Sequence, residues 1–425
     1  MRFIYNILFP IVFLFFIPGI LFKLIRRPGW KKTFGERFAL FSPERIRELQ
    51  KYRGAVWIHA VSVGETMVAL SMLQEWRRRE PSRKFVISTT TTTGQELARS
   101  KAPKDVAVIF CPIDFIFFVL RTLLLIRPSM LVIFETEIWP NMIAEAARYG
   151  AKVALVNARM SDKSCRGYYR WRIFFRPMLE HFNVISVQTE ADRQRFAAVA
   201  PAVRLEISGN MKFDQQVPEN LPEAGLEKYF GQGDWQILLA ASTHPGEEEL
   251  IGNVFQTLQT EFPALRLVIV PRHAERGAEI VAVLKKQGIS FRRRSVDDGT
   301  EENPVKCLLA DTTGEMLKFM NAADVVIMGK SLAGQNEGHN LIEPALLGKP
   351  IVTGSILKNF RFVLTALKEK AALVTVDSDD KLEDALRELF RDAELRKTLG
   401  EKALQAISQH KGATAKTINI LEELF

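Results

Sequence analysis

Residues 130–149 read MLVIFETEIWPNMIAEAARY. The first five, Met130–Phe134, are apolar without the alternation of a half-exposed strand, which is typical of a parallel strand covered on both faces. The pattern then becomes helical over Ile138–Tyr149. A strand that leads within a few residues into a helix is the repeating unit of an α/β fold.

The same unit recurs along both halves of the chain. In the first half, apolar runs predict strands at Ala55–His59, Phe85–Ser88, Val106–Phe110, Met130–Phe134, Val153–Asn157 and Val184–Gln188. In the second half they predict strands at Ile237–Ala241, Leu265–Val270, Val305–Ala310, Val325–Met328, Pro350–Thr353 and Ala372–Val376. Helical patterns lie between them, so each half predicts a doubly wound α/β domain with a parallel sheet.

The pattern lapses over Gln215–Trp235, which is rich in Pro, Glu and Gly and has the composition of a linker. We therefore predict an N-terminal segment over 1–27, a domain over 28–214, a linker over 215–235 and a second domain over 236–425. Two such domains in tandem are expected to enclose a cleft. Because parallel sheets bind ligands beyond the carboxyl ends of their strands, the residues that carry chemistry should lie just after the strands.

The N-terminal segment predicts a membrane anchor. Phe3–Phe22 carries no charged side chain, and its 20 residues are about the length that crosses a hydrocarbon core. The basic residues that follow are Lys23, Arg26, Arg27, Lys31 and Lys32. Such a flank predicts that the rest of the chain lies on the cytoplasmic side.

A cleaved signal peptide is disfavoured because no small-residue cleavage site follows the apolar run. Pro10 and Pro18 weaken a straight spanning helix, so a helix lying in the interface stays open.

The charge distribution and the cysteines narrow the function classes. The formal net charge is +9, of which residues 1–50 carry +6 and the other 375 residues only +3. A nucleic-acid binder usually spreads basic charge over its folded body, so nucleic acid is excluded as a partner and anionic lipid is favoured.

The three cysteines, Cys111, Cys165 and Cys307, lie far apart without a CxxC motif. That spacing argues against a disulfide framework and a zinc site, and it suits a reducing cytosol.

The first candidate for chemistry is Glu65, which ends the sequence HAVSVGE (59–65) directly after the first predicted strand. Ser62 and Gly64 predict a tight turn, and Glu65 opens the following helix. At the cleft this carboxylate could act as a general base. The alternative is a structural one, because acidic residues are common in first helical turns, where the helix dipole favours them. Glu36 is a rival base, but an ion pair with Arg37 or Lys32 explains it more simply.

Two further candidates in the first domain are Glu135 and Lys212. Glu135 and Glu137 follow the strand Met130–Phe134 at positions i and i+2, which would point them the same way along a strand. Carboxylates there could stabilise a positive transition state, and a helix start around Pro140 is an equally good explanation. Lys212 lies in GNMKFD (209–214) at the end of the first domain, where a lysine can hold an anionic group or be a solvated edge residue.

The second domain carries four turns of one kind. They are Pro271-Arg272-His273, Asp311–Glu315, Gly329-Lys330-Ser331 and Gly338–Pro344. Each pairs a strand end with small residues and a helix start, an arrangement that offers backbone N–H groups to a phosphate. Together they predict a nucleotide pocket, although neither a GxxxxGK[ST] nor a GxGxxG fingerprint is present.

The segment Arg166–Arg176 mixes basic and aromatic residues at helical spacing. It suits contact with lipid head groups, and equally a helix that packs on the sheet with its arginines in solvent.

As a set, these motifs closely resemble those of the Kdo (3-deoxy-D-manno-octulosonic acid) transferases of lipopolysaccharide assembly. The matching stretches are Gly35–Arg37, His59–Glu65, Glu135–Pro140, Asn157–Ser161, Gly209–Asp214, Ser242–Glu248, Pro271–His273, Gly314-Glu315 and Asn340–Glu343. The resemblance runs over almost the whole chain. It implies a GT-B glycosyltransferase fold, two Rossmann-like domains facing a cleft, with an N-terminal membrane anchor helix.

The resemblance also implies a reaction and its residues. The family moves Kdo from CMP-Kdo onto the lipid A precursor (lipid IVA) at the cytoplasmic face of the inner membrane, so the implied partners are these two substrates and membrane lipids. Glu65 is then the proton acceptor, and Glu135 and Lys212 stabilise the transition state. The CMP-binding residues carry over to Pro271, Arg272, Thr313, Gly314, Glu315, Asn340, Leu341, Ile342 and Glu343. No metal or other cofactor is implied, and inversion at the anomeric carbon is expected.

Two local departures from the family pattern concern loop shape. Gly329-Lys330-Ser331 stands where Gly-Gly-Ser is commoner, and Glu337–Asn340 stands where a double glycine is frequent.

Two other functions compete with the transferase. A sugar-nucleotide epimerase of the same fold would need no membrane segment, and a membrane-tethered CMP-sugar sensor would bind without turnover.

Overall fold

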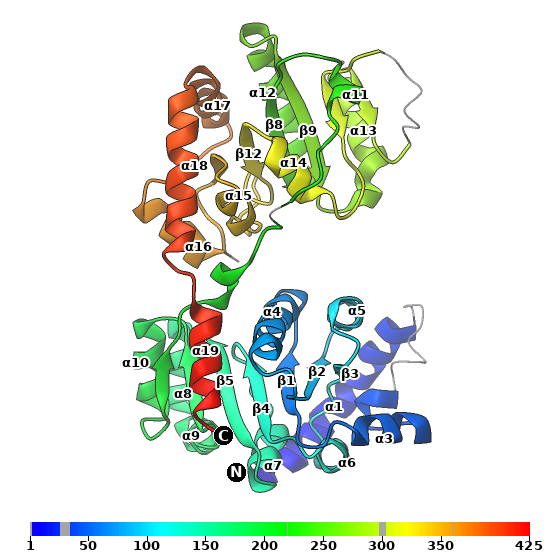
Figure 1. Ribbon diagram of the computed structural model, residues 1–425, viewed down its shortest axis with the longest axis vertical. Coiled ribbons are helices and arrows are strands. Elements are labelled where there is room, and N and C mark those ends of the chain that lie inside the picture. The colour runs from blue at the N-terminus through cyan, green and yellow to red at the C-terminus, as the bar shows by residue number, and fades with distance from the viewer. Residues whose placement is uncertain (1, 26–34, 219, 297–302, 359) are drawn as a thin grey trace. The chain divides into compact units, whose positions relative to one another are not determined.

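The computed structural model describes residues 2–25, 35–218, 220–296, 303–358 and 360–425. The chain divides into two compact units, unit 1 with Met1–Asp214 and Gly412–Phe425, and unit 2 with Gln215–Lys411. Each unit is built on a seven-stranded sheet flanked by helices (Figure 1). All neighbouring strands run parallel, which confirms the two doubly wound α/β domains that the apolar runs predict.

The sheet of unit 1 has the strand order β3-β2-β1-β4-β5-β6-β7. Its strands are β1 (Val56–Ala60), β2 (Phe85–Thr89), β3 (Ala107–Phe110), β4 (Met130–Phe134), β5 (Lys152–Ala158), β6 (Val184–Val187) and β7 (Leu205–Ile207). Six of them lie where the sequence predicts strands. The seventh, β7, was not predicted, because three half-exposed residues at a sheet edge carry little apolar pattern. The strand order reverses between β1 and β4, which is where open α/β sheets bind their ligands.

Helices cover both faces of this sheet. On one face lie α4 (Val63–Arg79), α5 (Thr92–Lys101) and α19 (Ala413–Glu422). On the other lie α3 (Pro43–Gln50), α6 (Ile116–Ile126), α7 (Pro140–Arg148), α8 (Asp162–Arg170), α9 (Arg172–Leu179) and α10 (Glu190–Val199). The central strands are buried on both sides, which explains why their sequences do not alternate.

The N-terminal helix α1 (Arg2–Ile25) lies beside α6 and α7 (Figure 1). Tyr5 Oη donates to Asp114 Oδ2 at 2.9 Å, Asn141 Nδ2 donates to Asn6 Oδ1 at 2.7 Å, and Phe9 packs against Phe115. Within the described residues, no helix combines the length and the apolar character needed to cross a membrane. The spanning anchor therefore stays a prediction. Its basic flank at Arg26, Arg27, Lys31 and Lys32 lies outside the described residues.

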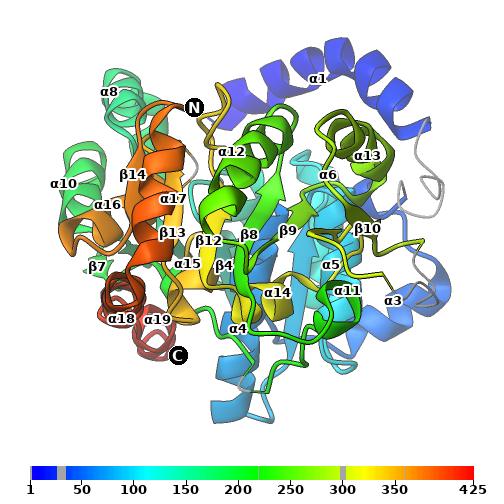
Figure 2. The same cartoon turned by 90° about the horizontal axis from the view of Figure 1, so that it is seen from above.

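The sheet of unit 2 has the order β10-β11-β9-β8-β12-β13-β14. The strands are β8 (Gln236–Thr243), β9 (Leu265–Pro271), β10 (Phe291–Arg293), β11 (Cys307–Leu309), β12 (Val325–Met328), β13 (Ile351–Gly354) and β14 (Val374–Val376). Figure 2 shows α12 (Glu247–Glu261), α13 (Gly277–Lys286) and α17 (Lys381–Arg391) on one face of it. On the other face lie α14 (Met316–Ala322), α15 (Ile342–Leu346) and α18 (Ala393–Ser408). The remaining helices are α11 (Glu227–Phe230) and α16 (Arg361–Glu369), and the two short 3₁₀ helices are η1 (Met211–Asp214) and η2 (Ala274–Arg276).

The C-terminal segment differs from the sequence expectation. The sequence places 236–425 in one domain, whereas residues 412–425 belong to unit 1, where α19 packs on α4. Its first turn is held there by Asp214, whose carboxylate accepts hydrogen bonds from Gly412 N and Thr414 N. Apolar residues of α19, Ile418 and Leu421, complete the core on this face of the sheet. A pattern of helical periodicity cannot reveal this return, because it does not say which core a helix covers.

Candidate active site

Glu65 lies one short turn after β1, at the edge where the strand order of unit 1 reverses. Ser62 is the N-cap of α4, and its hydroxyl accepts from Glu65 N at 3.2 Å. The Glu65 side chain folds back, so that Oε1 accepts from Ser62 Oγ at 2.8 Å and Oε2 accepts from Val61 N at 2.9 Å. This arrangement is close to a capping box, with the N–H of Val61 in place of that of the N-cap residue, and it agrees with the structural interpretation of a first-turn acid. It does not exclude the catalytic one, because a carboxylate has about four lone-pair sites and these contacts occupy two of them.

Glu135 follows β4, the strand next to β1, and adopts φ +58°. The strand ends at Phe134, so the strand alternation expected for Glu135 and Glu137 does not apply. The left-handed backbone instead turns Glu135 toward two cations from elsewhere in unit 1. Lys212 Nζ lies 3.0 Å from Oε1, and Arg159 Nη2 lies 3.2 Å from Oε2. The two oxygens of this buried carboxylate thus each face one cation.

Local backbone hydrogen bonds bring Lys212 to this carboxylate. Asn157, at the end of β5, has φ +52°, and its Oδ1 accepts from Met211 N at 3.0 Å. Asn210 Oδ1 accepts from Lys212 N at 3.0 Å, which sets the first turn of η1. Gly209, with φ +95°, lets the chain enter this turn. The structure thus joins Glu135 and Lys212, two residues that the sequence proposes separately.

Glu137 completes a group of three carboxylates. Burial raises its pKa, and the negative charges of Glu65 and Glu135 raise it further. Glu137 therefore lies near both Glu65 and Glu135, which follow the neighbouring strands β1 and β4. Glu36, by contrast, accepts from Arg45 Nε at 3.2 Å and from Phe110 N at 3.0 Å, so it is engaged in a structural role.

Arg159 was missed as a functional residue. It follows β5, the neighbour of β4, and the sequence singles out Asn157–Ser161 only as a matching motif. Its position after a strand of the parallel sheet was the available signal, because the carboxyl ends of parallel strands meet at one edge.

In unit 2 the predicted donor residues follow strands that are neighbours in the sheet. Thr313–Glu315 follow β11, Pro271 ends β9, and β8 and β12 come next. Pro271 is buried, whereas Arg272 is exposed and its backbone N donates to Thr243 O at 3.1 Å. Arg272 therefore leaves the sheet edge with its guanidinium available to an anion.

One of two stacked histidines, His339, lies near this arginine. His244 Nε2 and His339 Nε2 are 3.0 Å apart, with their rings stacked at 5.2 Å. Burial lowers the pKa of His339 to about 4, and the positive charges of Arg272, His244 and Lys330 contribute. His339 is thus neutral near pH 7, and its proximity to Arg272 links the turn after β9 to the segment that leads into α15.

The loop after β12, where Lys330 departs from the family pattern, is held by hydrogen bonds to a buried carboxylate. Lys330 adopts φ +62°, a conformation that glycine would enter without strain. Buried Glu247 holds the loop, accepting from Lys330 N at 2.8 Å, Ser331 N at 2.9 Å and Leu332 N at 3.0 Å. A Cβ at Gly329 would lie 2.4 Å from Ser242 O, so glycine is required there. Glu247 lies in the Ser242–Glu248 motif, and its structural role was not predicted.

Glu315 is engaged inside the protein. Its carboxylate accepts from Arg294 Nε at 2.6 Å and Nη2 at 2.8 Å, and it also bonds Lys318 and Thr312. These contacts, the Arg294 hydrogen bonds above all, lower its pKa to about 2. Glu315 therefore secures the turn that presents exposed Thr313 and Gly314, whose φ is +85°.

The segment Asn340–Glu343 is tied to Gln215. Gln215 accepts from Asn340 Nδ2 at 3.0 Å and donates to Glu343 Oε1 at 2.8 Å. Leu341 and Ile342 are 0% and 1% exposed, so their side chains belong to the core of unit 2. Only their backbone could reach a ligand, a distinction that the sequence motif does not make.

The described residues contain no group of three His, Cys, Asp or Glu side chains suited to hold a metal ion.

Comparison with known proteins gives a consistent result for both units. Residues 32–215 match the family described as 3-deoxy-D-manno-octulosonic-acid transferase (kdotransferase), and residues 253–406 match glycosyl transferases group 1. The chain is 31% identical over 410 residues to a 3-deoxy-D-manno-octulosonic acid transferase of Bordetella pertussis, which covers 93% of this chain and 94% of that protein. It is 29% identical over 401 residues to the protein of the same name from Haemophilus influenzae, covering 94% and 92%.

Among solved structures, the UDP-GlcNAc 2-epimerase of Neisseria meningitidis bound to UDP-GlcNAc resembles the fold. The TM-score is 0.58 at 12% identity, and the match covers 87% of this chain and all of that one. At this identity the likeness concerns the fold, which is that of two Rossmann-like domains, and not the reaction.

Proposed function

This chain belongs to the 3-deoxy-D-manno-octulosonic acid (Kdo) transferase family and is a glycosyltransferase, and we propose that it moves Kdo from CMP-Kdo to a lipid A precursor with inversion at the anomeric carbon. The observation that carries the proposal is the site in unit 1, where Glu65 and Glu135 follow neighbouring strands and the carboxylate of Glu135 faces two cations. A sugar transfer with a cationic transition state needs both a base and an anion of this kind.

In the proposed reaction Glu65 takes the proton of an acceptor hydroxyl. The freed oxygen attacks the anomeric carbon of Kdo as the bond from that carbon to the phosphate oxygen of CMP breaks. The electron pair of this bond leaves with CMP. Positive charge on the sugar is stabilised by Glu135, and Lys212 both holds Glu135 and attracts the carboxylate of Kdo.

Unit 2 is proposed to bind the CMP part of the donor. Arg272 is the cation that meets the phosphate, and the turns at Thr313-Gly314 and Asn340–Glu343 supply backbone groups. We propose that three of the residues support these turns without contacting CMP through their side chains. The Glu315 side chain is engaged in an ion pair, and those of Leu341 and Ile342 lie in the core.

A location at the cytoplasmic side of the inner membrane is part of the proposal. Helix α1 packs on α6 and α7 with one side and exposes apolar residues on the other, including Phe3 at 77% and Phe15 at 81%. An exposed apolar stripe on a helix suits the membrane interface, where the acceptor lipid would be.

The test is mass spectrometry of a tetra-acylated lipid A precursor incubated with CMP-Kdo and this protein. We expect mass increments of whole Kdo units that are absent with Glu65→Gln, and NMR of the product should show the anomeric configuration opposite to that of CMP-Kdo. No increment in spite of measurable CMP binding would contradict the transfer and support the sensor, and a retained configuration would contradict inversion.

A further inference from the structure

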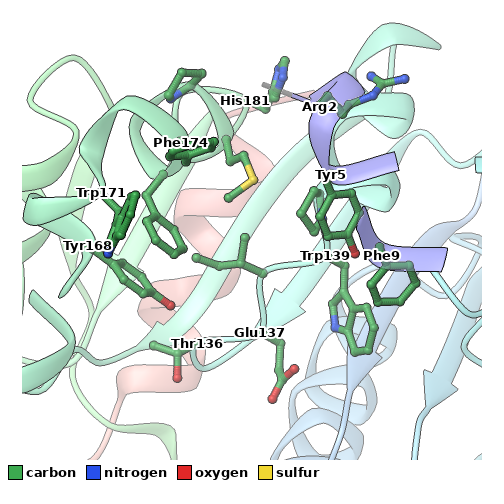
Figure 3. Close-up of a pocket in the computed structure, with 16 residues that line it drawn as sticks. Arg2, Tyr5, Phe9, Thr136, Glu137, Trp139, Tyr168, Trp171, Phe174 and His181 are labelled. Carbon is green, nitrogen blue, oxygen red and sulfur yellow. The ribbon is translucent and has the colours of Figure 1, made fainter. Parts of the chain in front are cut away.

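A cavity of about 760 Å³ in unit 1 has no role in the mechanism above. It lies between α1, α7, α8 and α9, and its size is that of a pocket for a small ligand. Figure 3 shows aromatic rings on two opposite sides. Tyr5, Phe9 and Trp139 lie on one side, and Tyr168, Trp171 and Phe174 lie on the other.

The walls of this cavity are held in place by contacts behind them. Tyr5 Oη donates to Asp114 Oδ2 at 2.9 Å, and the same carboxylate accepts from Asn141 N and Met142 N, each at 2.9 Å. The α1 wall is therefore fixed to the start of α7 through a buried acid. On the opposite side, Tyr168 stacks on Phe175 with ring centroids 4.0 Å apart. With its wall rings fixed in this way, the cavity is preformed.

The two ends of the cavity differ in chemistry. Arg2 and His181 lie at one end, and Thr136 and Glu137 lie at the other (Figure 3). Glu137 is the residue whose pKa is raised by burial and by the charges of Glu65 and Glu135, so this end adjoins the proposed catalytic carboxylates. A ligand in the cavity would thus have an apolar body between the helices and a polar part next to the reaction.

The outer surfaces of the wall helices are apolar as well. Trp171, between α8 and α9, is 55% exposed, and Ile173 of α9 is 65% exposed, next to the exposed Arg170 and Arg172. On α1, the exposed stripe described above includes Phe15. Large exposed hydrophobic side chains interspersed with arginine are typical of a surface that meets lipid.

We infer that this cavity binds one acyl chain of the glycolipid acceptor, with the sugar of the acceptor at the Glu137 end. The inference rests on the proposed function, because it takes the acceptor to be a glycolipid. A nucleotide fits the cavity poorly, since its ribose and phosphate would lose water against walls that are mostly aromatic and aliphatic. A peptide would leave backbone N–H and C=O groups unpaired against aromatic walls, whereas an acyl chain has no such groups.

The test fills the cavity and compares two acceptors in mixed micelles of an uncharged detergent. Ala144 lines the cavity, so Ala144→Phe places a ring inside it, and Met178→Phe does the same from α9. Each methylene withdrawn from apolar surroundings costs about a factor of four. We expect the ratio of kcat/KM for a tetra-acyl acceptor to that for an acceptor with four-carbon chains to fall at least tenfold in both variants.

Binding is measured separately from turnover, with an acceptor whose acyl chains carry bromine atoms. Bromine near Trp139 and Trp171 should quench tryptophan fluorescence in the unaltered protein, and the quenching should be lost in both variants. Phe117→Ser is the matched control, because Phe117 is 78% exposed on α6 and is not part of the cavity wall. It should keep both the quenching and the acceptor ratio.

The outcomes separate the two proposals. Absence of product with either acceptor, together with quenching that the variants abolish, would overturn the proposed function and support the acyl-chain site. Turnover of both acceptors with an unchanged ratio in folded variants, or quenching that persists in them, would overturn the acyl-chain site and leave the transferase in place.

Discussion

Unit 1 and unit 2 both place acidic side chains after the strands of a parallel sheet, but Glu65 of unit 1 has partners of a different kind from those of Glu315 in unit 2. In unit 2, Glu315 is bound by Arg294 through two hydrogen bonds, and Asp311 is bound by Arg293. In unit 1, the described contacts of the Glu65 carboxylate are with a hydroxyl and a backbone N–H. Proton uptake by Glu65 therefore breaks no ion pair, whereas proton uptake by Glu315 would. The comparison shows that position at the sheet edge does not by itself make a carboxylate a base.

The largest effect should come from Glu65→Gln, which removes the proton acceptor. We expect kcat to fall by about 10²- to 10⁴-fold, the usual contribution of general base catalysis. The amide oxygen can still accept from Ser62 or Val61, so the thermal midpoint should change little. Steady-state kinetics and a thermal melt measure both.

Glu137→Gln is the matched control for this prediction, because Glu137 is a half-buried carboxylate of the same group. Its effect on kcat should be smaller than that of Glu65→Gln. If Glu137→Gln were the more damaging change, the base would have to be reassigned to Glu137.

A smaller effect is expected for the cations that hold Glu135. Lys212→Met should lower kcat about 10²-fold, because it removes a charge from the transition state and leaves a nearly buried carboxylate with one partner fewer. Arg159→Met serves as its control, since Arg159 contacts the other oxygen of Glu135 but is mostly exposed. Equal losses in the two variants would show that Lys212 does no more than neutralise Glu135.

In unit 2, Arg272→Ala should weaken CMP binding by about 10- to 100-fold, the range for a hydrogen bond to a charged group. Isothermal titration calorimetry with CMP is the measurement. Lys358→Ala, at another basic residue of unit 2, controls for loss of overall positive charge. Unchanged CMP affinity in Arg272→Ala would remove Arg272 from the donor site.

Glu315→Gln tests whether this acid acts through structure. Losing the Arg294 ion pair should reduce the free energy of unfolding of unit 2 by about 2 kcal/mol, the usual range for charged hydrogen bonds. Denaturant titration followed by a probe in unit 2 checks the value. A variant with full stability but no CMP binding would instead make Glu315 a direct ligand.

The smallest effect concerns acid stability. The pKa of His339 is lowered to about 4, by burial first and then by the charges of Arg272 and His244. In the unfolded chain the His339 ring takes up a proton as the pH falls through about 6.5. In the folded protein it does so only at about pH 4. Stability is therefore lost as the pH falls from 6.5 to 4. His339→Gln should reduce that loss by about 1 kcal/mol, given the partial exposure of the ring.

Melts of the two proteins at pH 6.5 and 4.5 compare the losses. His59, whose pKa burial also lowers to about 4, contributes with the same sign in both proteins and cancels. An identical loss in the variant would show that His339 titrates normally.

Much of the fold could be read from local pattern. Strands with a continuous apolar run, such as Met130–Phe134 and Leu265–Val270, appear where the sequence predicts them because both of their faces are buried. The edge strands β7 and β10 escaped prediction because they have three residues and partly exposed side chains. The turn at Glu135 was misjudged for a different reason, since the strand ends at Phe134 and Glu135 takes a left-handed φ of +58°, which the residue types along the chain do not reveal.

The sequence by itself determined two α/β domains, the placing of functional residues after strands, and a motif set that names the family. These follow from periodicity and from residue types at short spacing, which are properties of neighbours along the chain. Only the tertiary structure decided that Lys212 meets Glu135, that α19 returns to unit 1 and that Glu315 is occupied by Arg294. Each of these depends on groups far apart in the chain, whose partners are set by burial and charge once the sheets have formed.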